Sequence, residues 1–210
     1  VAKYLPLVLQ EEQAELDSWL RTSIRSGQAH QGYFQYQGSI SSNSGSNSRS
    51  ISLFFDAGAV QLDYQPGWPQ LNQADAKVYI HDWGVEVELE RGRILETRVL
   101  QAQAEVLFAP ADQASMLTVQ AQLESNVADG LHLLQQTPLA AELSAFAHWR
   151  VTGQVPASFV LQLPLGDGQP PRVQFDLQLD NAGLQLTDLG LELERLRGRL
   201  EYDSASGLNG

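Results

Sequence analysis

Cysteine is absent from this chain, and lysine is nearly so. None of the 210 residues is cysteine, which excludes disulfides and thiolate metal sites but does not fix the compartment. Lysine occurs only as Lys3 and Lys77, and 25 acidic residues against 13 basic ones give a formal net charge of −12. Because phosphate neutralisation dominates the affinity of nucleic-acid binders, this balance argues against a nucleic-acid partner. It also disfavours electrostatic docking onto an anionic membrane.

Long apolar runs are missing as well. No stretch of ~18 apolar residues is present, and no basic-then-apolar segment opens the chain, so the sequence predicts neither a membrane span nor a signal peptide. The chain begins at Val1 and ends with Gly-Leu-Asn-Gly. We therefore expect an internal section of a longer protein, with any membrane anchor outside it. A hydrophobic content of 43% predicts a packed interior rather than global disorder.

What the sequence does contain is a strand pattern that recurs almost to the last residue. Between Val173 and Asp180, for example, apolar and polar residues alternate at every step. A period of two places the apolar side chains on one face of a sheet and the polar ones on the other. Connections of only a few residues require antiparallel neighbours. The pattern predicts a mainly β protein with about a dozen strands, among them approximately 51–56, 58–65, 75–81, 84–90, 93–100, 101–108, 149–155, 158–165, 172–180, 183–188, 190–194 and 198–203.

Three segments depart from this alternation. Residues 1–27 have the spacing of an amphipathic helix that covers the sheet, with Gly27 in the position of a C-terminal cap. Residues 39–50 form a flexible Ser-rich loop. Residues 125–147 return to helical spacing, with a Thr-Pro pair at a helix start. This last segment predicts a helical insertion between two sheet segments.

A faint internal repeat links the two halves of the chain. Residues 55–62 resemble residues 179–186 at an offset of 124, and residues 71–78 resemble residues 193–200 at an offset of 122. One explanation is a strand-turn-strand unit used twice along a growing sheet. Chance similarity between amphipathic strands is the other.

Residues with catalytic chemistry are present but not assembled. Glu86, Glu88 and Glu90 alternate with apolar residues and are followed by arginines, which is typical of the solvated face of a strand rather than a metal site. The four histidines lack the spacing of zinc ligands. No Gly-x-Ser-x-Gly elbow or phosphate loop occurs. We expect no enzyme activity, no catalytic residue, no metal and no cofactor.

The apolar face of the strands is therefore the candidate functional surface. It allows two arrangements: a closed β-sandwich filled by its own side chains, or a curled sheet whose inner face stays open to acyl chains. Periodicity alone favours the sandwich. The candidate residues on this face are Ile51, Leu53, Phe55, Val60, Leu62, Val78, Ile80, Val85, Val87, Leu89, Val106, Phe108, Leu117, Val119, Phe159, Leu161, Leu163, Val173, Phe175, Leu177, Leu184, Leu186 and Leu200.

Several segments resemble the YhdP family, the large AsmA-like proteins of the Gram-negative envelope. Residues 4–6 (Tyr-Leu-Pro) and 32–38 are similar to family sequences. The most specific match is residues 59–71, a strand followed by a Pro-Gly-Trp-Pro-Gln-Leu turn. Thr137-Pro138-Leu139 follows in the expected order, whereas the loop at 39–50 is atypical of the family.

This resemblance implies a fold and a function. It implies an extended, curled antiparallel β-sheet, a taco-like groove with a few short covering helices. The whole of residues 1–210 would be one section of a periplasmic bridge anchored in the inner membrane by a segment outside this chain. The groove would conduct phospholipids toward the outer membrane. The expected partners are phospholipid acyl chains, flanking sections of the same longer chain and unidentified envelope proteins. The alternative is a non-enzymatic structural module of the envelope with a closed sandwich core.

Overall fold

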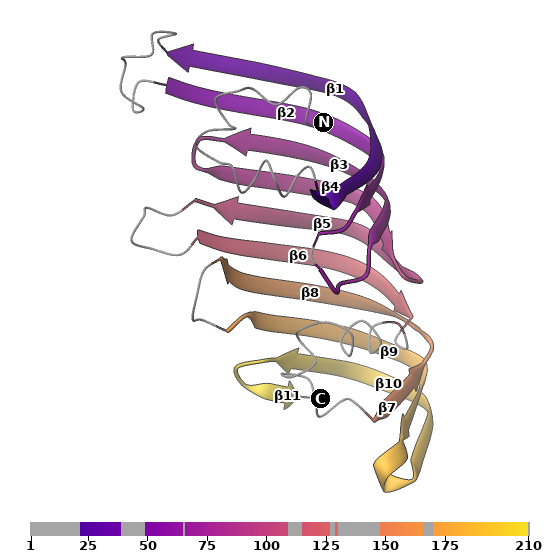
Figure 1. Cartoon of the computed structure of the whole chain (residues 1–210). Coiled ribbons are helices and arrows are strands. Elements are labelled where there is room, and N and C mark those ends of the chain that lie inside the picture. The colour runs from indigo at the N-terminus through magenta and orange to yellow at the C-terminus, as the bar shows by residue number, and fades with distance from the viewer. Residues whose placement is uncertain are drawn as a thin grey trace.

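One antiparallel sheet makes up nearly all of the part of the chain that the structure describes. The computed structural model describes residues 22–38, 49–64, 66–108, 115–126, 129, 148–165 and 170–209. Within them the strands are joined in a single 11-stranded sheet, which Figure 1 shows as a curved ladder running from β1 to β11. The prediction of a mainly β, antiparallel protein is therefore confirmed.

The strands follow one another across the sheet almost in chain order. The order is β1-β2-β3-β4-β5-β6-β8-β9-β10-β11, with β7 paired to β9 beyond the end of β8. Their bounds are β1 (Ile24–Gly38), β2 (Arg49–Leu62), β3 (Leu71–His81), β4 (Gly84–Ile94), β5 (Thr97–Leu107), β6 (Ser115–Asn126), β7 (Trp149–Thr152), β8 (Gln154–Leu165), β9 (Arg172–Leu186), β10 (Leu191–Asp203) and β11 (Gly207–Asn209).

The sheet is open. Its order starts at β1 and ends at β11, and these two strands do not pair with each other. The described strands thus form neither a closed barrel nor two facing sheets. The closed β-sandwich favoured by periodicity alone was wrong. Alternation fixes which side chains share a face, but it says nothing about what that face packs against.

Bulges bend the long strands near one end. Ala59 in β2 and Gln73 in β3 have φ angles of 51°, and Asn181 in β9 and Arg195 in β10 have φ angles of 61° and 55°. Each lies at a shift in the pairing register. An extra residue in one strand bends it and increases its twist, and Figure 1 shows the strands turning in this region. The bulges therefore make the flat ladder into a curved surface.

The same pair of bulges occurs twice, which supports the internal repeat. In β2–β3, Val60 pairs with Ala74 and one bulge lies on either side of this pair. In β9–β10, Ala182 pairs with Leu196 with the same arrangement. Val60 and Ala182 are 122 positions apart (182 − 60), as are Ala74 and Leu196 (196 − 74). The offset of 124 expected for the first half is thus too long by two, an error that a period-two pattern cannot reveal.

The two copies predict the effect of exchanging their bulge residues. Position 59 is alanine and the equivalent position 181 is asparagine, and both are exposed with positive φ. Asparagine tolerates this left-handed conformation better than alanine does. We expect Ala59→Asn to raise the free energy of unfolding by about 0.5–1 kcal/mol and Asn181→Ala to lower it similarly. Urea denaturation measures both, and shifts of the same sign would contradict the explanation.

Strand and helix bounds differ from expectation in several places. Segments 51–56 and 58–65 were expected to be separate, yet β2 runs through both as far as Leu62, because Gly58 and Ala59 form a bulge rather than a turn. The turn between β4 and β5 is at Leu95 and Glu96, inside the expected strand 93–100. Leu95 adopts a φ of 54° there, although leucine is not a turn-forming residue.

The expected covering helices are not confirmed. Residues 24–27, assigned to the end of the first helix, belong to β1 instead, and most of segment 1–27 lies outside the described residues. Ser125 and Asn126 end β6, and nearly all of the remaining insertion 125–147 also lies outside them. Of the loop 39–50, Arg49 and Ser50 belong to β2, and 39–48 are not described.

Candidate functional site: the apolar concave face

The register aligns the apolar residues of successive strands into rows that cross the sheet. In one row Phe55 pairs with Val78, Val78 with Val87 and Val87 with Ala104. The row continues through Val119, Leu161 and Val173. Directly opposed residues of antiparallel strands share a face. One apolar band therefore runs from strand to strand over β2–β6, β8 and β9.

Neighbouring rows contain the other candidates. One row consists of Leu53, Ile80, Val85, Val106, Leu117 and Leu163, and a second contains Leu89, Phe159 and Phe175. Leu177 pairs with Leu200, and Leu184 and Leu186 pair with Leu193 and Leu191 beyond the bulges. Val60 and Leu62 pair with Ala74 and Leu71. Ile51 pairs with Tyr36 of β1, and Phe108 directly follows β5. With the exception of Phe108, which lies outside the strands, the register thus brings the predicted residues to one face.

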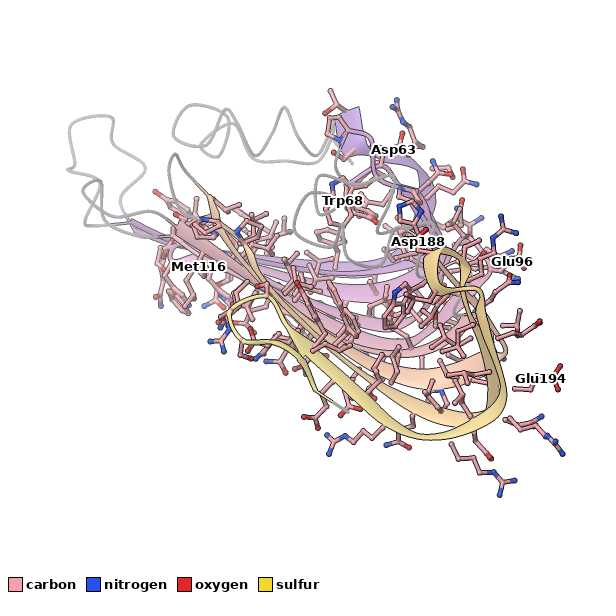
Figure 2. The ribbon with its side chains drawn as sticks, turned by 90° about the horizontal axis from the view of Figure 1, so that it is seen from below. Asp63, Trp68, Glu96, Met116, Asp188 and Glu194 are labelled. Atoms are coloured by element: carbon pink, nitrogen blue, oxygen red, sulfur yellow. The ribbon has the colours of Figure 1, made fainter. Side chains whose placement is uncertain are left out.

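This apolar face is the concave one. Figure 2 shows Trp68 on the hollow side of the sheet, and Glu96 and Glu194 on the outer side. Trp68 packs against the buried pair Leu161 and Val173. The side of the sheet that carries the apolar rows is therefore the side that the curvature encloses.

Most of the predicted residues are only half-buried. Ile51, Ile80, Leu161 and Val173 are buried, and the remaining predicted residues keep part of their surface accessible. A core filled by its own side chains buries large aliphatic residues almost completely. An extended, partly accessible apolar surface is instead a feature of interaction and ligand sites.

The prediction from sequence missed the small residues of this face. Ala57, Ala74, Ala76, Ala157 and Ala182 are all buried on it. Ala102, Ala104 and Ala121 pair within the apolar rows. The signal was available, because these alanines fall on the apolar positions of the alternation. We call the apolar surface of the concave face its floor. The small alanine side chains leave space above this floor that bulkier side chains would fill.

The connection between β2 and β3 folds over this floor. We call residues 63–64 and 66–70 the Trp68 loop. Its base is held by Asp63, whose carboxylate accepts hydrogen bonds from Arg25 Nε at 2.5 Å and from Gln70 Nε2 at 2.7 Å. The backbone N–H of Asp63 also donates to the carbonyl oxygen of Ser23 at 2.8 Å. The loop therefore leaves the sheet from a fixed point.

The loop also has an aromatic pair. The rings of Tyr64 and Trp68 meet edge to face, with centroids 5.9 Å apart, a favourable arrangement of two aromatic quadrupoles. Burial raises the pKa of the Tyr64 phenol to about 12, since a phenolate would lose hydration there. Tyr64 therefore stays neutral at physiological pH, which suits an apolar surrounding.

The hydrogen bonds to the Asp63 carboxylate predict how the stability of the protein depends on pH. The hydrogen bond from Arg25, followed by that from Gln70, lowers the pKa of Asp63 below its ordinary value. A lowered folded-state pKa contributes stability that is present above the unfolded-state value of ~3.9 and is lost as pH falls through the folded-state value. We expect Asp63→Asn to lower the melting temperature at pH 7, and this deficit to shrink as the pH falls below ~4. Glu192→Gln, at an exposed position of β10, is the control. A deficit that stays constant down to pH 2 would contradict this explanation.

A second aromatic group, from β7, β9 and β10, packs against the same Leu161–Val173 cluster as Trp68. Phe175 and Tyr202 pair across β9 and β10 with stacked rings whose centroids are 4.9 Å apart. Trp149 of β7 also packs against the cluster of Leu161 and Val173. Tryptophans from two distant segments of the chain thus converge on one place in the concave face.

The convex face carries charged residues and ion pairs, together with an aromatic row of Tyr33, Phe54 and Tyr79. Lys77 Nζ lies 2.5 Å from Glu90 Oε1, and Arg199 pairs with Asp176. Glu86, Glu88 and Glu90 are exposed on this face, where the alternation places them. Among the described residues, no group of three His, Cys, Asp or Glu side chains could hold a metal ion.

The family assignment follows from comparison with known proteins. The family model described as "YhdP protein" matches residues 1–210. The chain belongs to the YhdP family. Comparison with curated proteins finds no match, and comparison with solved structures finds none. Within this YhdP-family chain, the segment with the most specific resemblance, residues 59–71, contains the end of β2 and the Trp68 loop. None of the described residues forms a helix with the length and hydropathy of a membrane span.

Proposed function

We propose that this chain is one section of a bridge that conducts phospholipids between the inner and outer membranes along its concave face. The observation that carries the proposal is the open sheet with a continuous, half-buried apolar face. Membership of the YhdP family, whose members are bridge-like lipid transport proteins, supports it. The section acts in the periplasm as part of a protein anchored in the inner membrane by a segment outside this chain.

The chemistry of the face suits movement of lipids rather than catalysis. Contact with apolar surface contributes ~25 cal/mol per Å², without directionality. Such contacts are spread over at least seven strands, from Phe55 on β2 to Val173 on β9. An acyl chain that moves from one strand to the next exchanges one set of weak apolar contacts for an equivalent set. Conduction therefore requires no catalytic residue and no cofactor, and we infer that the protein is not an enzyme.

The partners follow from the same arrangement. Phospholipid acyl chains occupy the concave face while headgroups remain toward water. The sheet ends at β1 on one side and at the β10–β11 pair on the other. Because edge strands carry unpaired backbone groups, flanking sections of the same longer chain continue the sheet at these two edges. The charge of −12 disfavours nucleic acid as a partner.

Native mass spectrometry of the purified chain tests the proposal. We expect mass shifts that correspond to intact phospholipids, removed by mild delipidation and restored by incubation with phosphatidylethanolamine and phosphatidylglycerol vesicles. A protein mass free of lipid before and after this incubation would contradict lipid conduction. A water-soluble fluorophore of similar size serves as the control for unspecific adduct formation.

A further inference from the structure

Trp68 contacts a part of the floor that is remote from its own strands. The Trp68 loop connects β2 and β3, whereas Leu161 and Val173 lie on β8 and β9. In the sheet order β8 is four strands from β3, which is about 19 Å along a flat sheet at ~4.8 Å per strand. Figure 2 shows Trp68 within the hollow rather than at its rim. The loop therefore crosses the concave face, and the indole ends on the central apolar row.

The position of the indole coincides with the path that an apolar cargo would take. Val119, Leu161 and Val173 follow one another across β6, β8 and β9 in that row. Leu161 and Val173 are only 9% and 1% exposed, and Trp68 is among the side chains packed against them. Elsewhere in the same row Val78 and Val87 remain half-buried. Within this row, the residues that Trp68 packs against are thus buried, whereas Val78 and Val87 are more accessible.

The loop combines a fixed base with a contact that can be exchanged. Polar bonds from Arg25 and Gln70 to Asp63 hold the base. The tip is held by apolar contact and by the ring of Tyr64. Apolar contact is non-directional, so an acyl chain can replace it without leaving a polar group unpaired. The tip can therefore leave the floor while the base stays in place.

We propose that Trp68 is the control point of the concave face: its indole occupies the position of an acyl chain on the row through Leu161 and Val173, and cargo must displace it to pass. This inference rests on the proposed function, because it identifies a residue that governs the same path. It assigns to the Trp68 loop a role in cargo passage rather than in covering a core.

Locking the loop onto the floor tests this role. The chain has no cysteine, so a Trp68→Cys, Leu161→Cys variant offers only two thiols, which a short bifunctional maleimide joins. Uptake of a phospholipid with a fluorescent acyl chain, from vesicles of phosphatidylethanolamine and phosphatidylglycerol, is measured for the purified 210-residue chain before and after joining. We expect the joined protein to take up lipid at least about tenfold more slowly than the same variant unjoined, since the floor contact can no longer be exchanged.

Removing the indole should have the opposite effect. We expect Trp68→Ala to take up lipid on the order of tenfold faster than the wild type, because cargo no longer replaces an aromatic contact. Trp68→Phe should fall between the two. Near-ultraviolet and far-ultraviolet circular dichroism show whether each variant keeps the sheet. If Trp68→Ala loses the fold, the joined and unjoined forms of the double-cysteine variant, compared with each other, still decide.

The outcomes separate this inference from the proposed function. If the wild type takes up lipid and joining the loop changes nothing, Trp68 covers the floor without controlling it, and the inference is overturned while conduction stands. If the wild type takes up no lipid at all, the proposed function itself fails. Slower uptake in the joined form together with faster uptake in Trp68→Ala supports the inference.

Discussion

Val87→Glu is expected to weaken phospholipid binding by the folded chain strongly. Val87 is half-buried in the middle of the apolar floor, between Val78 on β3 and Ala104 on β5. A carboxylate at this position strongly resists transfer into an apolar surrounding, and any acyl chain crossing β4 would surround it. We expect retained lipid, measured by native mass spectrometry, to fall on the order of tenfold or more.

The neighbouring residue provides a matched control. Glu88 lies next in β4 on the convex face, paired with Lys77 and Gln103, and is exposed. Glu88→Gln should therefore leave lipid binding unchanged. Since a buried charge also costs folding energy, Val87→Thr adds a polar group of nearly the same shape and should reduce binding by a smaller factor. A folded Val87→Glu protein that retains as much lipid as the wild type would end the argument that this face binds acyl chains.

Gly84→Ala should be the most destabilising single-methyl change in the described sheet. A Cβ at Gly84, which is buried at the start of β4, would lie 2.4 Å from the carbonyl oxygen of Val106 on β5. That atom belongs to the backbone, so relief requires the two strands to separate. Overpacking of this kind costs about 2–4 kcal/mol. Urea denaturation should show a clear fall in the midpoint with an unchanged slope.

Gly92→Ala in the same strand is the control for Gly84→Ala. It shows how much stability is lost by replacing glycine where the atom closest to the added methyl group belongs to a side chain rather than to the backbone. A Cβ at Gly92 would lie 2.9 Å from Cδ1 of Leu71, the far end of a flexible side chain that can move. We expect a cost below about 1 kcal/mol at this position. Equal losses at the two glycines would show that the contact with Val106 does not determine the stability of β4.

The sequence allowed the assignment of faces but not of curvature. Alternation such as that of Val85, Val87 and Leu89 needs only the period of a strand, and the paired register confirms that these residues share a face. Whether that face closes on a second sheet depends on bulges. Bulges arise at residues such as Ala59 and Gln73, which carry no turn signal of their own.

Strand ends and long-range contacts were beyond prediction for related reasons. The turn at Leu95 and Glu96 uses a leucine with positive φ, a conformation that the surrounding hairpin imposes against local preference. The contact of Trp68 with Leu161 and Val173 requires the curvature of the whole sheet. A pattern within one segment cannot report it. The resemblance to the YhdP family identified the Trp68 segment as distinctive, although nothing in the sequence indicated its position over β8.

The two bulges of each repeated unit have a consequence for how such a protein can lengthen. One extra residue in β2 before the pair of Val60 and Ala74 is matched by one in β3 after it, and β9 and β10 do the same around Ala182 and Leu196. Each hairpin thereby cancels its own frame shift. Duplication of a complete hairpin lengthens the sheet and leaves its apolar and polar faces unchanged. Insertion of a single residue in a strand would instead move the later side chains of that strand to the opposite face. Growth by whole duplicated hairpins thus preserves both faces, and it changes the length of the sheet in discrete steps.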